Sequence, residues 1–245
     1  MNILDLYIEN VTYNDILSRI QNHLSQREYF SFSYVNVNVS LNSNSDKTLR
    51  GNLNNISAIY PDGIGVYLAS KFLYGKLGLK ERVNGTDLYY KILDLAQKGN
   101  YKIFFFGGSD KAASVLNQNL KMIYPNLIIG GIIPKDESFD EQILEKINQT
   151  NSDILFLGLG TPYQEKWIAT FGKKTNIPIQ IAVGSGIDFL SGTYKRAPQF
   201  IRNVGLEWLY RLFLEPKRLW KRYLLGIPHF LFLIVKQKLF SRETF

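Results

Sequence analysis

The sequence contains no cysteine and only two histidines, at positions 23 and 229. The absence of cysteine excludes a disulfide framework, cysteine-ligated zinc, an iron–sulfur cluster and a cysteine nucleophile. Two histidines leave little room for a histidine-rich metal site or a Ser-His-Asp triad. If the chain is an enzyme that moves a proton near neutral pH, we expect a carboxylate to act as the base.

Long apolar runs are also lacking. The longest, Phe230–Val235, has six residues, whereas a membrane-spanning helix needs about 20 apolar residues. The first residues have neither the cationic nor the apolar region of a signal peptide. We therefore expect no transmembrane segment and no secretory leader.

Acidic residues are scarce in the last part of the chain. Residues 195–245 contain 11 Lys or Arg and three Glu, a balance of 11 − 3 = +8, whereas 18 basic and 18 acidic groups cancel in residues 1–194. The same last segment carries 10 aromatic residues, including two of the three Trp. The chain is therefore predicted to consist of an α/β body, residues 1–194, and a basic, aromatic appendage, residues 195–245.

The segment Lys217–Leu224 indicates what the appendage contacts. In a helix its four basic side chains would share one face, and four apolar side chains would share the other. This pattern is typical of a helix that lies on an anionic membrane. Two alternatives stay open: an ordinary helix packed on the body with a solvated basic face, and an RNA-binding surface.

Strand-like and helix-like patterns alternate through the body. The predicted strands are Ile3–Ile8, Tyr29–Val37, Ile56–Tyr60, Tyr101–Phe106, Leu127–Ile132, Ile154–Gly158 and Ile179–Val183. The predicted helices are Thr12–Leu24, Val39–Leu53, Ile64–Tyr74, Thr86–Gln97, Asp110–Ile123, Ser138–Gln149 and Pro162–Phe171, with Ser138 and Glu141 as a capping box. This order predicts an α/β fold, a mostly parallel Rossmann-like sheet with flanking helices, followed by the helical appendage.

Ligands of such sheets bind beyond the carboxyl ends of the strands. Ser33–Asn38 places two Asn side chains at one predicted end. Tyr60–Gly65 places Asp62 at the next, between Pro61 and a glycine, where a carboxylate is a candidate general base. The alternative for Asp62 is a side chain that caps its own turn.

Three further strand ends are rich in glycine. Phe104–Asp110 leads a buried strand through Gly107, Gly108 and Ser109 into a helix, an arrangement that directs backbone N–H groups at an anion such as a diphosphate. Leu157–Trp167 repeats that order and would direct Gln164 toward the ligand. Val183–Gly192 sets Asp188 among glycines, where its carboxylate would suit a sugar hydroxyl. A plain strand-to-helix turn remains the alternative.

No two Asp are spaced as D-x-D, the pattern with which many nucleotide-sugar enzymes hold a divalent metal. A diphosphate leaving group would then need cationic side chains, and the appendage could supply them. We therefore expect no metal site.

The segments PDGIGV, ERVNGTD, FFFGGS, GLGTPYQEKW, GSGIDFLSGTYKRAP and GLEWLYRLFLEPKRLWKR together resemble the WecG/TagA/CpsF family of glycosyltransferases, from about residue 34 to residue 225. The resemblance implies an inverting enzyme that moves N-acetylmannosamine or a related hexose from a UDP-sugar to a polyprenyl-diphosphate-linked sugar. It implies work without a metal or other cofactor, in the synthesis of teichoic acid, capsule or related polymers. It also implies a peripheral protein on the inner, cytoplasmic face of the bacterial membrane.

The resemblance also carries residue roles. It implies that Asp62 is the general base, that Arg82 lies near the substrate or its diphosphate, and that Gln164 contacts the sugar. The implied UDP-binding residues are Gly107, Gly108, Ser109, Gly184, Gly186 and Asp188. The arginines implied to neutralise the diphosphate are Arg211, Arg218 and Arg222.

One motif departs from the family. Many members have Thr-x-Asn after the second strand, where this chain has Tyr34-Val-Asn36, unless the register slips and Ser33 takes the place of the threonine. Tyr34 and Asn36 are thus the expected substrate-binding residues there, and the exchange bears on which sugar is used.

Two other functions stay open. A non-enzymatic basic module that binds RNA or anionic lipid would explain the appendage but not the glycine-rich strand ends. A Rossmann dehydrogenase would need G-x-G-x-x-G after the first strand, which is absent. For the glycosyltransferase we expect no nucleic-acid partner, and we expect that a homo-oligomer would cover the apolar appendage away from a membrane.

Overall fold

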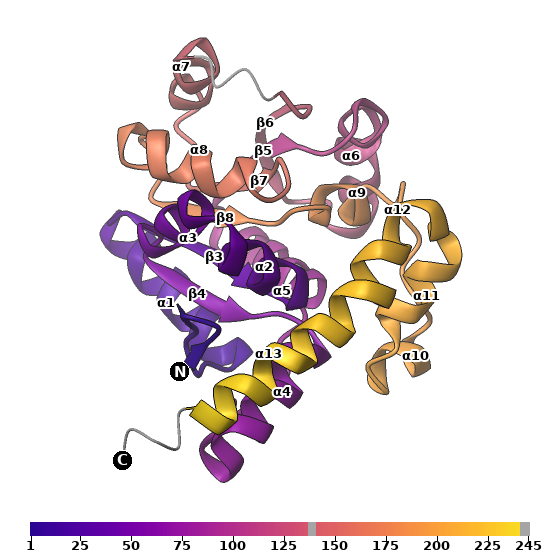
Figure 1. Ribbon diagram of the computed structural model, residues 1–245. Coiled ribbons are helices and arrows are strands. Elements are labelled where there is room, and N and C mark those ends of the chain that lie inside the picture. Colours follow the sequence, from indigo (N-terminus) through magenta and orange to yellow (C-terminus); the bar gives the residue numbers. More distant parts are fainter. Residues whose placement is uncertain (137–140, 241–245) are drawn as a thin grey trace.

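The computed structural model describes residues 1–136 and 141–240. Within them, six strands form one sheet in the order β4-β3-β8-β7-β5-β6, and every neighbouring pair is parallel. The strands are β3 (Phe30–Val35), β4 (Ala58–Pro61), β5 (Lys102–Gly107), β6 (Ile128–Ile133), β7 (Ile154–Gly158) and β8 (Ile179–Ala182). The α/β prediction is therefore confirmed, since helices flank this sheet on both faces (Figure 1).

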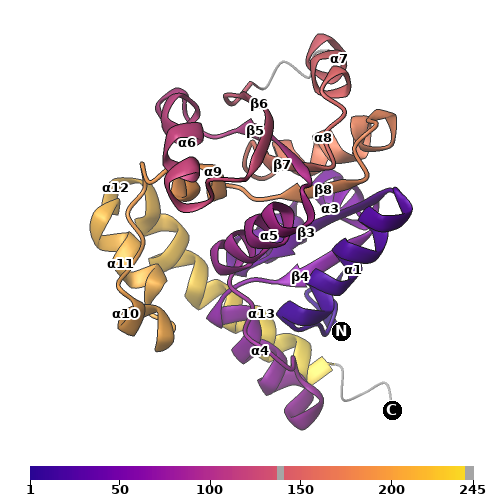
Figure 2. The same ribbon diagram turned by 180° about the vertical axis from the view of Figure 1, so that it is seen from behind.

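Alternation along the strands sends side chains into two cores. Phe104 and Phe106 of β5 face one core, and Ile103 and Phe105 face the other. The first core is covered by α2 (Val37–Ser45), α3 (Lys47–Asn54), α4 (Ile64–Tyr74), α7 (Glu141–Gln149), α8 (Tyr163–Phe171) and part of α13 (Gly226–Phe240). The second is covered by α1 (Tyr13–Gln26), α5 (Gly85–Gly99), α6 (Asp110–Ile123) and α9 (Gly186–Leu190), as Figure 2 shows from behind.

Two predicted elements differ from the structure. The strand predicted over residues 3–8 is a small antiparallel hairpin of β1 (Asn2–Ile3) and β2 (Leu6–Tyr7), because Leu4 and Asp5 take positive φ angles of 50° and 62° and reverse the chain.

The helix predicted over residues 39–53 is two helices, α2 and α3. It breaks at Asp46, whose carboxylate accepts the N–H groups of Thr48 and Leu49 at 2.8 and 3.1 Å and so caps a new helix. The predicted capping box at Ser138 lies outside the described residues.

The appendage is helical, as predicted, with α10 (Gln199–Asn203), α11 (Glu207–Leu214), α12 (Pro216–Trp220), a π-helical turn (Lys221–Leu225) and α13. Phe230 and Ile234 of α13 are buried in the first core, against α2 and α4. Lys238 donates from Nζ to the carbonyl oxygen of Leu73 at the end of α4. The appendage is therefore docked on the body.

The apolar face predicted for residues 217–224 is divided in the structure. Leu219 and Tyr223 are buried, whereas Trp220 and Leu224 are exposed. Leu219 and Tyr223 are four residues apart and form one row along the helical segment, while Trp220 and Leu224 form the neighbouring row. Trp220 and Leu224 thus stand on the outer surface beside the basic side chains.

Length and composition do not exclude a membrane crossing, contrary to the sequence expectation. The helical segment Pro216–Phe240, 25 residues with a mean hydropathy of 1.3 in its most apolar window, is long and apolar enough to cross a membrane. The expectation considered the apolar run Phe230–Val235, widened at most to Tyr223–Val235, whereas the helical segment extends from Pro216 to Phe240 through Gly226 and Pro228. In the structure its inner side packs on α2 and α4, contacts that a helix crossing a bilayer away from the body would lose.

Candidate active site

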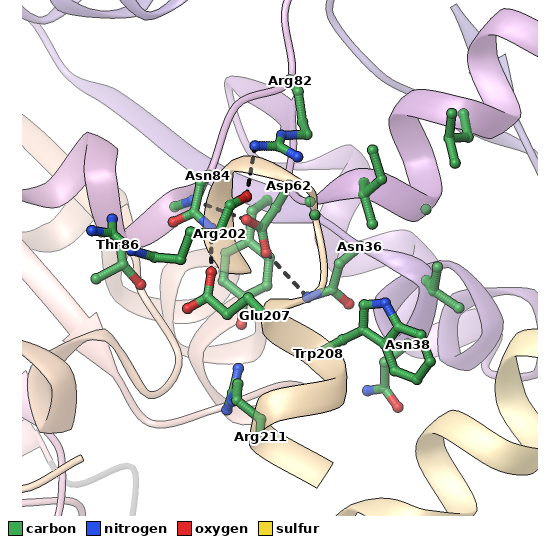
Figure 3. Close-up of a pocket in the computed structure, with 18 of the residues that line it drawn as sticks. Asn36, Asn38, Asp62, Arg82, Asn84, Thr86, Arg202, Glu207, Trp208 and Arg211 are labelled. Carbon is green, nitrogen blue, oxygen red and sulfur yellow. Dashed lines mark hydrogen bonds between the residues drawn. The ribbon is translucent and has the colours of Figure 1, made fainter. Parts of the chain in front are cut away.

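A cavity of about 790 Å³ opens at the carboxyl ends of β3, β4 and β8 (Figure 3). Residues of α10, α11 and α13 form its opposite wall. The body and the appendage therefore enclose it together, at the edge of the sheet where parallel α/β folds bind ligands.

Asp62 lies at the polar end of this cavity, just after β4. Its Oδ1 accepts the backbone N–H of Gly85 at 2.9 Å, and its Oδ2 accepts from Nδ2 of Asn36 at 3.3 Å. An ionised carboxylate has about four lone-pair positions, so these two bonds orient Asp62 and leave it able to accept a proton. The sequence left open that Asp62 caps its own turn. Among the described residues, its side chain instead bonds to Asn36 and Gly85.

The surroundings of Asp62 shift its proton affinity. Burial raises the pKa of Asp62 above its ordinary value, while the N–H of Gly85, the amide of Asn36 and the charges of Arg222 and Arg211 oppose that rise. A general base works best when its pKa lies near the working pH. The raised pKa therefore suits a carboxylate that takes a proton from a hydroxyl group.

Two tyrosines, Tyr34 and Tyr89, line the cavity beside Asp62. Burial, followed by the charges of Glu165 and Asp62, raises the pKa of Tyr34 to about 12. Its phenol is therefore neutral at physiological pH. Ser33 points the other way and donates to Glu165 Oε1 at 3.1 Å, because neighbouring residues of a strand face opposite sides. Tyr34, and not Ser33, thus meets the ligand space.

A polar cluster joins the start of α5 to the appendage. Asn84 donates from Nδ2 to Glu207 Oε2 at 2.9 Å. Asp87 Oδ1 pairs with Arg196 Nη2 at 2.9 Å and with Arg202 Nη1 at 3.0 Å. We call these five residues the α5 clamp. Because Gly85 in the same turn donates to Asp62, the clamp ties the docking of the appendage to the position of that carboxylate.

Arg82 also lies at this junction and lines the cavity. It donates from Nη2 to the carbonyl oxygen of Arg202 at 2.9 Å (Figure 3). A guanidinium has five N–H donors, so one backbone bond does not exhaust it.

Two of the three predicted appendage arginines reach the cavity. Arg211 and Arg222 both line it. The guanidinium carbon of Arg211 lies 5.1 Å from the ring centre of Phe189, and that of Arg222 lies 5.5 Å from the ring centre of Tyr223. Arg211 Nε is buried and has no hydrogen-bond partner among the residues described. Arg218 instead pairs with the neighbouring Glu215 and is not part of the cavity wall.

Gln164 lies behind the wall and does not line the cavity. It is fully buried, accepts the N–H of Gly184 at 2.8 Å and donates to Glu165 Oε1 at 2.7 Å. A Cβ on Gly184 would lie 2.3 Å from Tyr34 Oη. Gln164 and Gly184 therefore support the Tyr34 side of the wall, whereas Gly186 is part of the lining.

The turn after β5 is also outside the lining. Asp188 Oδ1 accepts from Ser109 Oγ at 2.8 Å and from Ser109 N at 3.2 Å, which joins this turn to α9. A Cβ on Gly107 would lie 2.3 Å from the carbonyl carbon of Gly158, and one on Gly108 would lie 2.7 Å from Ile187. These glycines allow close packing of the turns, and the ligand roles of these residues stay predictions.

Neither the clamp residues nor Trp208, which also lines the cavity, was predicted from the sequence. A signal was present, because Asn84 and Asp87 belong to ERVNGTD, and Glu207 and Trp208 to GLEWLY. What the pattern did not contain is the pairing of Asn84 with Glu207 across 123 positions.

In the part of the chain that the structure describes, no three His, Cys, Asp or Glu side chains gather closely enough to hold a metal ion. The expected independence of metal remains a prediction.

Comparison with known proteins gives one consistent result. Residues 1–244 match the family described as "Glycosyl transferase WecG/TagA/CpsF family". A Bacillus subtilis (strain 168) protein named N-acetylglucosaminyldiphosphoundecaprenol N-acetyl-beta-D-mannosaminyltransferase is 30% identical over 225 residues, 92% of this chain and 86% of that protein. Proteins of the same name from Bacillus spizizenii and Staphylococcus aureus (strain NCTC 8325 / PS 47) are 33% and 31% identical, each over 76% of this chain and over 71% and 72% of their own lengths.

Proposed function

The chain belongs to the WecG/TagA/CpsF family of glycosyltransferases, and we propose that it moves a sugar from a UDP-sugar onto a polyprenyl-diphosphate-linked sugar, with Asp62 as the general base. N-acetylmannosamine, the sugar in the names of the relatives, is the first donor to test. The observation that carries the proposal is the oriented carboxylate of Asp62, facing a cavity that also holds Arg211 and Arg222.

The proposed reaction is a single displacement. The acceptor hydroxyl oxygen attacks the anomeric carbon of the donor, and a carboxylate oxygen of Asp62 takes the hydroxyl proton. The bond from the anomeric carbon to the diphosphate oxygen breaks, and its electron pair leaves with UDP. Attack from the face opposite the leaving group inverts the anomeric carbon.

The cationic side chains would act on the leaving group. The diphosphate of a UDP-sugar already carries two negative charges and gains one more as the bond breaks, and guanidinium groups in a partly desolvated cavity stabilise this added charge strongly. Arg211 lines the cavity and is placed for this role, because its buried Nε has no hydrogen-bond partner among the described residues. Arg222, just before α13, is left for the diphosphate of the acceptor. This assignment needs no metal ligand from the protein.

We propose that the protein acts at the inner face of the bacterial membrane. Lys217 and Lys221 are exposed on α12 and the following turn, beside the exposed apolar side chains of Trp220 and Leu224. Basic and aromatic side chains gathered in this way favour an anionic membrane surface. Away from membrane, we expect a second copy to cover this surface, which sedimentation with and without the appendage would test.

Asp62→Asn tests the proposal directly. With UDP-N-acetylmannosamine and a lipid-linked N-acetylglucosamine diphosphate, the variant should lose roughly 10²–10⁴-fold in rate, because only the proton acceptor is removed. Asp94→Asn, an exposed change on α5, is the matched control and should keep full activity. Near-normal turnover by Asp62→Asn would exclude Asp62 as the base.

A thermal-shift titration with UDP, ADP, GDP and NAD, without added metal, separates the donor class. A rise in melting temperature that is selective for UDP supports a UDP-sugar donor. An equal response to all four, or selectivity for another nucleotide, contradicts it. RNA or lipid binding without any glycosyl transfer would return the non-enzymatic module to consideration, against the family membership.

A further inference from the structure

One end of the cavity is apolar. On α4, Ile64, Leu68 and Phe72 line it and are spaced four residues apart, so they lie in one row along the helix. Leu68 and Phe72 are 57% and 53% exposed, although both are large and apolar. The row begins two residues after Asp62 and leads away from it.

A second row faces the first. On α13, Ile227, Leu231 and Val235 line the cavity with the same spacing, and Phe230 and Ile234 close its floor. Leu231 is 56% exposed. From Ile227 to Val235 the row is about 12 Å long, at 1.5 Å per residue.

The two helices run in the same direction from the polar end. At the polar end, the charge of Arg222, just before α13, opposes the rise that burial causes in the pKa of Asp62, just before α4. At the far ends, Lys238 of α13 donates to the carbonyl oxygen of Leu73 of α4. Figures 1 and 2 both show α13 alongside α4. The result is a groove with a carboxylate and arginines at one end and two apolar rows at the other, which we call the α4/α13 groove.

We propose that the α4/α13 groove binds the isoprenoid chain of the lipid-linked acceptor. This assignment rests on the proposed function and adds to it where the lipid lies. An acceptor whose hydroxyl reaches Asp62 carries, in order, a sugar, a diphosphate and an apolar chain. The groove presents matching groups in that order: the carboxylate, then Arg222 just before α13, then the apolar rows.

The charge at the junction is the reason to favour a prenyl diphosphate over other apolar occupants. The acyl chains of a bilayer would not need to share a cavity with Asp62, and a second copy of the chain would place no anion beside Arg222. The remaining exposed face of α13, which includes Phe232 and Leu239, is free for the bilayer. One helix can thus face the lipid chain on one side and the membrane on another.

Binding of farnesyl diphosphate, compared with inorganic diphosphate, tests the groove without any glycosyl transfer. The full-length protein should bind farnesyl diphosphate at least tenfold more tightly, because burying an isoprenoid chain on apolar side chains is favourable. Phe72→Gln and Leu231→Gln should each reduce this preference about tenfold, since each places a polar group in the groove. Both side chains are more than half exposed, so the fold should persist.

Phe232→Gln is the matched control. Phe232 is the next residue along α13, is 66% exposed and is not part of the cavity wall, so this variant should keep the preference. Loss of preference in Phe232→Gln equal to that in Leu231→Gln would overturn the proposal, as would unchanged preference in Phe72→Gln and Leu231→Gln. Lost vesicle binding or a changed sedimentation mass in these two variants, with intact preference, would assign the groove to the bilayer or to a second copy instead.

Kinetics separate this proposal from the proposed function. With acceptors that carry either a farnesyl chain or a methyl group on the diphosphate, Phe72→Gln should raise KM only for the farnesyl acceptor. If the wild type turned over the farnesyl and methyl acceptors equally well, the groove proposal would be wrong and the proposed function would stand. If the farnesyl preference fell in Phe72→Gln and Leu231→Gln but no UDP-sugar served as donor, the groove proposal would stand and the proposed function would be wrong.

Discussion

The side-chain amide of Asn36 forms hydrogen bonds both to Asp62 and to the first turn of α2. Its Oδ1 accepts the N–H of Val39 at 3.1 Å and caps α2, while its Nδ2 donates to Asp62 Oδ2 at 3.3 Å. The start of α2 and the candidate base are therefore fixed relative to each other. Removing one bond without the other separates the structural role of Asn36 from its effect on the base.

Asn36→Ser should move the acid limb of the kcat/KM profile to higher pH. The serine hydroxyl can still cap α2 but does not reach Asp62, so the ionised carboxylate loses a donor and its already raised pKa rises further. The melting temperature should change little. Asn36→Ala loses the cap as well and should cost about 1 kcal/mol of stability. An acid limb that stays in place in Asn36→Ser would show that the bond does not tune Asp62.

Asp87→Asn should loosen the appendage. Asp87 pairs with two arginines of the appendage, and the loss of these pairs should cost about 1.5–3 kcal/mol, the range of a hydrogen bond to a charged group. We expect kcat/KM to fall severalfold and limited proteolysis within residues 195–225 to accelerate. Asp94→Asn breaks an exposed ion pair inside α5 and should change neither. Equal proteolysis of the two variants would refute the coupling.

Gly107→Ala and Gly51→Ala should have opposite effects on stability. At Gly107, φ is +124° and a Cβ would lie 2.3 Å from the carbonyl carbon of Gly158, so alanine should destabilise the fold by at least about 2 kcal/mol. Gly51 lies inside α3 with nothing within 4 Å of a Cβ, so alanine should stabilise by about 0.5–1 kcal/mol. Denaturant unfolding measures both, and a neutral Gly107→Ala would contradict the close approach of the two turns.

Glu165 should make stability fall as pH rises. Its Oε1 accepts from Ser33, Thr161 and Gln164, while its buried Oε2 has no partner among the residues described, and burial raises the pKa of Glu165. A raised folded-state pKa means that the folded state binds a proton more tightly than the unfolded state, so its contribution is present at low pH and is lost as pH rises through the folded pKa.

Glu165→Gln removes that titration. The melting temperature of the variant minus that of the wild type should therefore increase from pH 5 to pH 8. Other titrating groups are common to both proteins and cancel in the difference. A difference that is constant with pH would show that the buried carboxyl does not titrate in this range.

Local pattern located most of the fold. Buried strands such as Ile154–Gly158 are continuous apolar runs bounded by turn residues, and both signals lie within a few positions of the strand. The failures also have local causes that the pattern concealed. The predicted helix ends at Asp46 because its carboxylate caps the start of a new helix, α3. The predicted strand is a hairpin because Leu4 and Asp5 take positive φ angles.

The sequence by itself determined the parallel α/β body, the concentration of positive charge and aromatic residues in the appendage, and the place of Asp62 at a strand end. These follow from spacing and composition, which are local properties. Only the tertiary structure decided which strand-end residues meet the ligand space. Gln164 and Asp188 bond to neighbouring turns and do not line the cavity. Asn84 bonds to Glu207, 123 positions along the chain, and α13 packs against α4. Such choices depend on contacts between distant segments, which bury surface only once the whole chain is folded, so no local pattern specifies them.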